Sequence, residues 1–124
     1  MKQPAICENH LYSKAYARGK KSVQRNLIVY LLKDKAAYRI AKGRRDGQRV
    51  NRLGLAVRKN VGGAVQRNRV KRILRAAYAD CERTLPLRRG YLIVLVARPR
   101  ALGADSPRLA EELAQAFAEL GLLS

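Results

Sequence analysis

The chain has 124 residues, with 27 Lys and Arg against 9 Asp and Glu, and a formal net charge of +18. Its hydrophobic fraction of 48% is enough for one core, so we expect a single domain over residues 1–124. The longest apolar run, residues 91–97, is too short to cross a bilayer, and the start of the sequence has no signal-peptide core. We therefore expect a cytoplasmic protein with no membrane partner.

The first half of the chain predicts one short helix and two strands. The helix runs from about Asn9, a possible N-cap, to Arg18, and Gly19 ends it. Residues 26–32 are apolar and β-branched enough for a strand. Residues 41–51 are polar and basic and predict an exposed loop, either a phosphate contact or a disordered tether. Residues 53–57 alternate as a half-buried strand whose second face is available to a partner.

The most informative segment begins at Val61 and predicts a helix that extends to about Leu85. At about 100° per residue, one stripe is apolar and comprises Val70, Ile73, Leu74, Ala77 and Cys81. The opposite face comprises Arg67, Asn68, Lys71, Arg72 and Arg75, with Arg69 at its edge. Such a face suits the phosphate backbone of a nucleic acid, because each neutralised phosphate releases counterions. The alternative is the solvated basic surface of an ordinary helix.

The last third of the chain predicts a central strand at residues 91–97 and a final helix. Ser106 and Pro107 give an N-cap and a first-turn proline, and Gly121 stops the helix. Its apolar face and its acidic residues indicate a structural cover for the sheet; the apolar positions are Leu109, Leu113, Phe117 and Leu120. Residues 54–97 form a strand–helix–strand unit, so we expect an α+β fold.

The sequence offers no catalytic residue and no metal site. The carboxylates outside the last helix are scattered, whereas a metal-dependent nuclease clusters them. A metal-free ribonuclease typically needs histidines, and His10 is the single one, so we interpret it as a surface residue. Cys7 and Cys81 lack the further ligands that zinc requires, and Cys81 continues the apolar stripe as a buried thiol.

Three tyrosines suggest a second binding surface. Tyr12 and Tyr16 are four residues apart and share one helix face. Strand alternation places Tyr30 on one face with Asn26, Ile28 and Leu32. Aromatic platforms beside positive charge suit single-stranded nucleic acid, where stacking contributes about 1–3 kcal/mol per base. Equally, these tyrosines can simply pack the helix on the sheet.

From about Leu11 to Leu123 the sequence resembles the protein subunit of bacterial ribonuclease P. Residues 62–72, Gly-Gly-Ala-Val-Gln-Arg-Asn-Arg-Val-Lys-Arg, match the family pattern Gly-Asn-Ala-Val, one variable residue, Arg-Asn-Arg-hydrophobic-Lys-Arg. The helix ending in Gly19, the strand at 26–30 and the strand at 93–99 are similar too. The chain departs from the pattern at Gly63, where asparagine is common, and at Asn60, where lysine is common.

The resemblance implies an α-β-β-β-α-β-α sandwich with a left-handed crossover around the basic helix, against the usual preference. It implies a monomer, one copy per RNA, that assists a catalytic RNA in endonucleolytic removal of the 5′ leader from precursor tRNA. In that family the RNA, with Mg²⁺ that it mainly holds, performs the hydrolysis, so the isolated protein is expected to be inactive.

The resemblance also assigns roles to residues of this chain. The RNA subunit would contact Arg67, Asn68, Arg69, Lys71, Arg72 and Arg75. The cleft for the single-stranded leader would be lined by Tyr12, Tyr16, Tyr30, Ala56, Arg58 and Lys59. Two other classes compete: a structural RNA-binding protein of ribosomal type, and a nuclease active without RNA.

Overall fold

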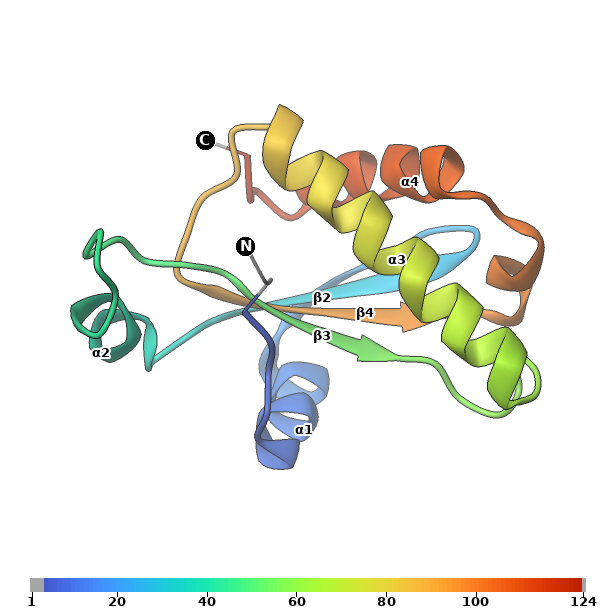
Figure 1. Cartoon of the computed structure of the whole chain (residues 1–124), viewed down its shortest axis with the longest axis horizontal. Coiled ribbons are helices and arrows are strands. Elements are labelled where there is room, and N and C mark those ends of the chain that lie inside the picture. Colours follow the sequence, from blue (N-terminus) through green and yellow to red (C-terminus); the bar gives the residue numbers. More distant parts are fainter. Residues whose placement is uncertain (1–3, 124) are drawn as a thin grey trace.

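A computed structural model describes residues 4–123 and is built around a four-stranded sheet (Figure 1). In chain order the elements are α1 (Asn9–Arg18), β1 (Lys20–Val23), β2 (Leu27–Lys33), α2 (Ala37–Lys42), β3 (Arg52–Ala56), α3 (Ala64–Thr84), β4 (Tyr91–Ala97), the short 3-10 helix η1 (Pro99–Gly103) and α4 (Ser106–Glu119). The predicted α+β class is confirmed. The implied order of elements also holds, with α2 and η1 as additions.

The sheet has the strand order β1-β2-β4-β3. Its first two pairings are antiparallel, whereas β3 lies parallel to β4 and α3 connects them. This arrangement confirms the strand–helix–strand unit and the central place of β4; the hand of the crossover stays a prediction. Helices α3 and α4 cover one face of the sheet, and α1 crosses the other (Figure 1).

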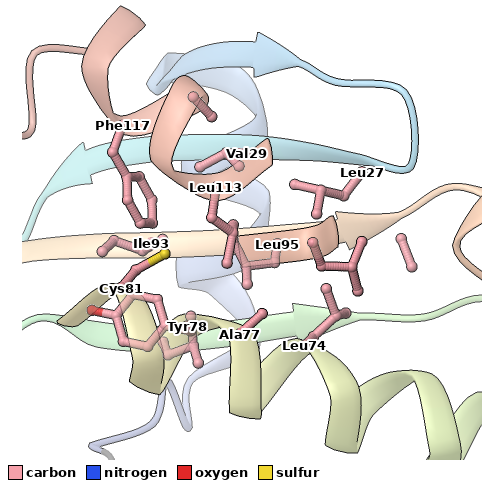
Figure 2. Packing of buried hydrophobic residues seen from close by; sticks show 14 of the residues in the cluster. Leu27, Val29, Leu74, Ala77, Tyr78, Cys81, Ile93, Leu95, Leu113 and Phe117 are labelled. Carbon is pink, nitrogen blue, oxygen red and sulfur yellow. The ribbon is translucent and has the colours of Figure 1, made fainter. Parts of the chain in front are cut away.

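Strand β4 is buried on both faces, and the alternation of its side chains divides the core in two. Ile93 and Leu95 lie in the main cluster beneath α3 and α4 (Figure 2). Leu92 and Val94 belong to a smaller cluster beneath α1. In β2, Leu27, Val29 and Leu31 join the main cluster as alternation predicts.

Helix α3 buries most of the predicted stripe, although Ile73 is only partly buried. Tyr78, which the stripe omits, is fully buried, and its ring meets Phe117 of α4 edge-on at 6.1 Å between centroids (Figure 2). The helix begins at Ala64 and not at Val61. Gly62 has a φ of +157°, and the Gln66 side chain accepts a hydrogen bond of 2.8 Å from the Gly63 N–H.

Several predicted helix boundaries are wrong. Glu8, not Asn9, is the N-cap of α1. Asp105, not Ser106, caps α4, and its carboxylate accepts from the Arg108 N–H at 3.0 Å. That side-chain acceptor decides the boundary, because it satisfies an amide that the first turn leaves unpaired.

Three further predictions need correction in the strands and the loop. Periodicity predicted no strand at Lys20–Val23, where the structure has β1. A strand at this place was contained only in the element order that the family resemblance implies. Asn26 does not share the face of Tyr30, because its backbone N–H and side chain both bond Glu112 of α4. The predicted loop at 41–51 is not exposed throughout, because Ala41 belongs to α2 and is buried, and Asn51 bonds the Arg88 carbonyl and the Tyr91 N–H.

The second face of β3 is covered at Arg52 and Gly54, so the prediction that a partner could reach it holds only at its end, Ala56. Arg52 is 8% exposed and forms two bonds to Asp34, from Nε at 2.7 Å and from a terminal nitrogen at 3.0 Å. Its other terminal nitrogen lies 3.0 Å from Glu8, the N-cap of α1. Arg52 therefore ties the start of α1 to the ends of two strands.

We expect Arg52→Met to destabilise the fold by about 3 kcal/mol in urea unfolding, since it leaves the buried Asp34 carboxylate without its cation. The double variant Arg52→Met, Asp34→Leu serves as the control, because it removes both buried charges. It should recover most of the loss, and an equally unstable double variant would contradict the assigned cause.

Candidate nucleic-acid interface

The basic face of α3 points into solvent. Asn68, Arg69, Arg72 and Arg75 are exposed, and Arg67 and Lys71 are half-buried. Within the described part of the chain, none of the five cations forms an ion pair with a carboxylate. The Nε of Arg67 is buried and has no hydrogen-bond partner among residues 4–123. The predicted surface therefore exists as one helix face of uncompensated positive charge.

The opposite face of the sheet presents rows of side chains that follow the strand register. Leu32, Leu92 and Arg52 form one row, and Tyr30, Val94 and Gly54 form the next. Helix α1 lies over these two rows, so that Leu92, Val94 and Arg52 are buried.

The third row stays open. It comprises Val23, Ile28, Val96 and Ala56 across all four strands. Val23 is 54% exposed, and the other three are half-buried. We call this row the open strip. It is an apolar surface as wide as the sheet, and a partner can reach it because α1 stops short of it.

Tyr16 and Tyr30 lie beside the open strip and contact each other. Their ring centroids are 5.0 Å apart at an interplanar angle of 69°, an edge-to-face pair, and both side chains remain half-exposed. The structure thus brings these two predicted residues together. The packing interpretation is confirmed for this pair, and the stacking role stays a prediction that the accessible ring surface allows.

Tyr12, one turn before Tyr16 on α1, packs on the same small cluster but at the β3 edge. Its ring packs on Gly54, where an added Cβ would lie 2.8 Å from the ring atoms. The Leu55 backbone hydrogen-bonds to its hydroxyl, while burial is the main cause that raises the pKa of Tyr12. Tyr12 borders a groove of about 530 Å³ that also includes Ile6, Lys71 and Arg75. This groove connects the α1 side of the sheet with the basic face of α3.

The remaining cleft candidates lie at the end of β3. Ala56 is part of the open strip, and Arg58 and Lys59 are exposed in the turn that follows, which a bond from the Val61 N–H to the Arg58 carbonyl closes at 3.0 Å. These two cations therefore lie between the end of the open strip and the start of α3.

The residue analysis missed Lys21 and Val23 of β1, which share the strip's face opposite Tyr30 and Ile28. The Lys-Lys-Ser-Val segment lacks an apolar alternation, so periodicity could not find it. The family resemblance could have located this strand, because the element order that it implies has three strands before the basic helix.

Few side chains within residues 4–123 are candidates for binding a metal ion or acting as a nucleophile. No three His, Cys, Asp or Glu side chains gather there into a group that could hold a metal ion. No helix in this range is both long and apolar enough to cross a bilayer. Cys81 is buried, as predicted, and burial raises its pKa to about 11, so its thiol is a poor nucleophile at neutral pH.

The uncompensated basic helix and the aromatic-lined strip together define an α+β protein of the nucleic-acid-binding class. Comparison with known proteins gives the particular family. The ribonuclease P family model matches residues 1–121, so the chain belongs to the ribonuclease P protein family.

Individual relatives agree with this assignment. The chain is 30% identical to the ribonuclease P protein component of Clostridium botulinum (strain Loch Maree / Type A3), over 98% of each chain. It is 34% identical to that of Symbiobacterium thermophilum, over 90% of this chain and 86% of the relative.

Solved structures show the same fold. The Staphylococcus aureus RNase P protein matches with a TM-score of 0.75 at 22% identity, over 99% of this chain and all of that one. The Thermotoga maritima RNase P protein matches with a TM-score of 0.68 at 20% identity, over 91% and 94%. The chain is thus an RNA-binding protein subunit of an endoribonuclease that processes tRNA, and its partner is the ribonuclease P RNA.

Proposed function

We propose that this chain assists a catalytic RNA in removing the 5′ leader of precursor tRNA, as a single folded domain and one copy per RNA in the cytoplasm. The observation that carries the proposal is the basic face of α3, whose cations have no carboxylate partner among residues 4–123. Charges left uncompensated in this way favour a phosphate backbone, because each contact releases counterions.

The two surfaces divide the binding between two RNAs. The α3 face takes the structured ribonuclease P RNA through its exposed and half-buried cations. The open strip with Tyr16 and Tyr30 takes the single-stranded leader, because unstacked bases can lie on aromatic rings and apolar side chains. Arg58 and Lys59 then face the leader's phosphates where the strip ends.

Magnesium belongs with the RNA in this proposal. The described residues gather no carboxylate group able to hold it, and both surfaces are lined by cations and apolar side chains. Bound to the RNA, Mg²⁺ supplies the charge stabilisation and the activated water that phosphodiester hydrolysis needs. The protein's part is to hold RNA and leader in place.

Reconstitution tests the proposal directly. Adding the protein to a ribonuclease P RNA should increase cleavage of precursor tRNA at low Mg²⁺ concentration, where the RNA alone is weak. The protein without RNA is the control. Cleavage by the protein alone would instead make it a nuclease in its own right, and no effect on the RNA would favour a structural RNA-binding protein.

Replacing both Arg67 and Arg69 with Ala should weaken binding to the RNA subunit and flatten its dependence on salt. Each lost phosphate contact lowers the slope of log affinity against log salt by about 0.9. Asn68→Ala is the matched comparison, because it removes hydrogen bonds without charge and should weaken binding at nearly constant slope. An unchanged slope in the arginine variant would place the RNA on another surface.

Tyr16→Ala should lower the affinity of the holoenzyme for precursor tRNA by about 1 kcal/mol, the loss of roughly one stacking contact. Mature tRNA has no leader, so its binding should barely change, and a leader cut to one or two nucleotides should erase the difference. Because Tyr16 also packs on Tyr30, thermal unfolding must accompany the measurement. Equal losses for both tRNAs, with a lower melting temperature, would show a packing role alone.

A further inference from the structure

A second basic pocket lies on the other side of α1 from the open strip. It has a volume of about 270 Å³ and lies beside the start of α2. Leu11, Leu32 and Leu92 provide apolar lining. The charged and titratable residues around it are Glu8, His10, Lys14, Lys33, Asp34, Lys35, Arg39 and Arg52.

The acidic groups of this pocket are already engaged. Asp34 and Glu8 both bond the Arg52 guanidinium, and Asp34 also accepts from the Ala36 N–H at 3.0 Å. The other four cations, Lys14, Lys33, Lys35 and Arg39, form no ion pair within residues 4–123. The pocket therefore has an excess of positive charge that its own carboxylates do not offset.

Two of these cations line the pocket together and repel each other. Lys14 of α1 and Lys35 before α2 come from different elements, and the Lys35 ammonium is the main cause that lowers the pKa of Lys14. Like charges held together repel, so an anion between them would be stabilised by both. The fold thus brings two ammonium groups together beside an apolar floor.

This pocket is separate from the surfaces described above. Lys14 and Tyr16 are two residues apart on α1 and so point to opposite sides of the helix. The pocket lies at the α2 end of the sheet, whereas α3 begins at the opposite end (Figure 1). A leader on the open strip would have to cross α1 to reach it.

We propose that this pocket, between α1 and the start of α2, binds a backbone phosphate of RNA through Lys14, Lys35 and Arg39. The proposal rests on the proposed function, because it takes the ligand from the same RNAs. The phosphate belongs either to the ribonuclease P RNA or to a part of the precursor tRNA that does not lie on the open strip.

The experiment compares two double variants with equal loss of charge. Lys14→Ala with Lys35→Ala alters the pocket, and Lys20→Ala with Arg100→Ala is the control at exposed positions elsewhere. Binding is measured against salt for the ribonuclease P RNA and, with the holoenzyme, for precursor tRNA. Thermal unfolding checks the fold, which should not weaken when two repelling charges are removed. Lys14→Arg with Lys35→Arg keeps the charge and should retain affinity.

The pocket variant should bind one of the two RNAs about tenfold more weakly than the control variant, with a salt slope lower by about one. The RNA that shows the loss is the source of the phosphate. Equal binding by both double variants to both RNAs would overturn the proposal. In parallel, the wild-type protein is tested for stimulation of precursor tRNA cleavage by the RNA. This measurement distinguishes a failure of the proposed function from a failure of the pocket proposal.

Discussion

Burial of β4 on both faces is the constraint on which the rest of the structure depends. A strand whose residues are apolar on both sides must be covered twice, so helices are needed above and below the sheet. Helices α3 and α4 cover most of one face. On the other face α1 is only ten residues long and covers two of three rows, so the open strip is the part of the sheet that α1 cannot reach.

Several of the nine acidic residues hold buried donors in place, so they offset little of the surface charge. Glu112 binds Asn26, Glu119 accepts a bond from Ser22, and Asp34 holds Arg52. These carboxylates satisfy buried donors and fix α4 and α1 against the sheet. The net charge of +18 is therefore less balanced at the surface than the composition alone indicates, because Asp34, Glu112 and Glu119 have partners within the fold.

Periodicity predicted the parts of the fold that a single element determines. The alternation in β2 and the stripe of α3 follow from one segment's own side chains, so Val29, Leu74 and Cys81 were placed correctly. The predictions that were wrong concern residues whose environment depends on partners distant in sequence. Arg52 would ordinarily be expected at the surface, and it is buried because Asp34 and Glu8, 18 and 44 residues away, surround it. No local pattern carries that information.

The tyrosines show why residue type alone left two roles open. Helical spacing predicted one shared face, and both rings do pack on the sheet beneath α1, Tyr12 on Gly54 and Tyr16 on Tyr30. Neither ring is fully buried, because each lies where α1 meets an uncovered part of the sheet. A ring in that position both anchors the helix and borders an accessible surface. Packing therefore does not exclude the proposed recognition role, since the contact that fixes α1 leaves the rings beside the strip and the groove.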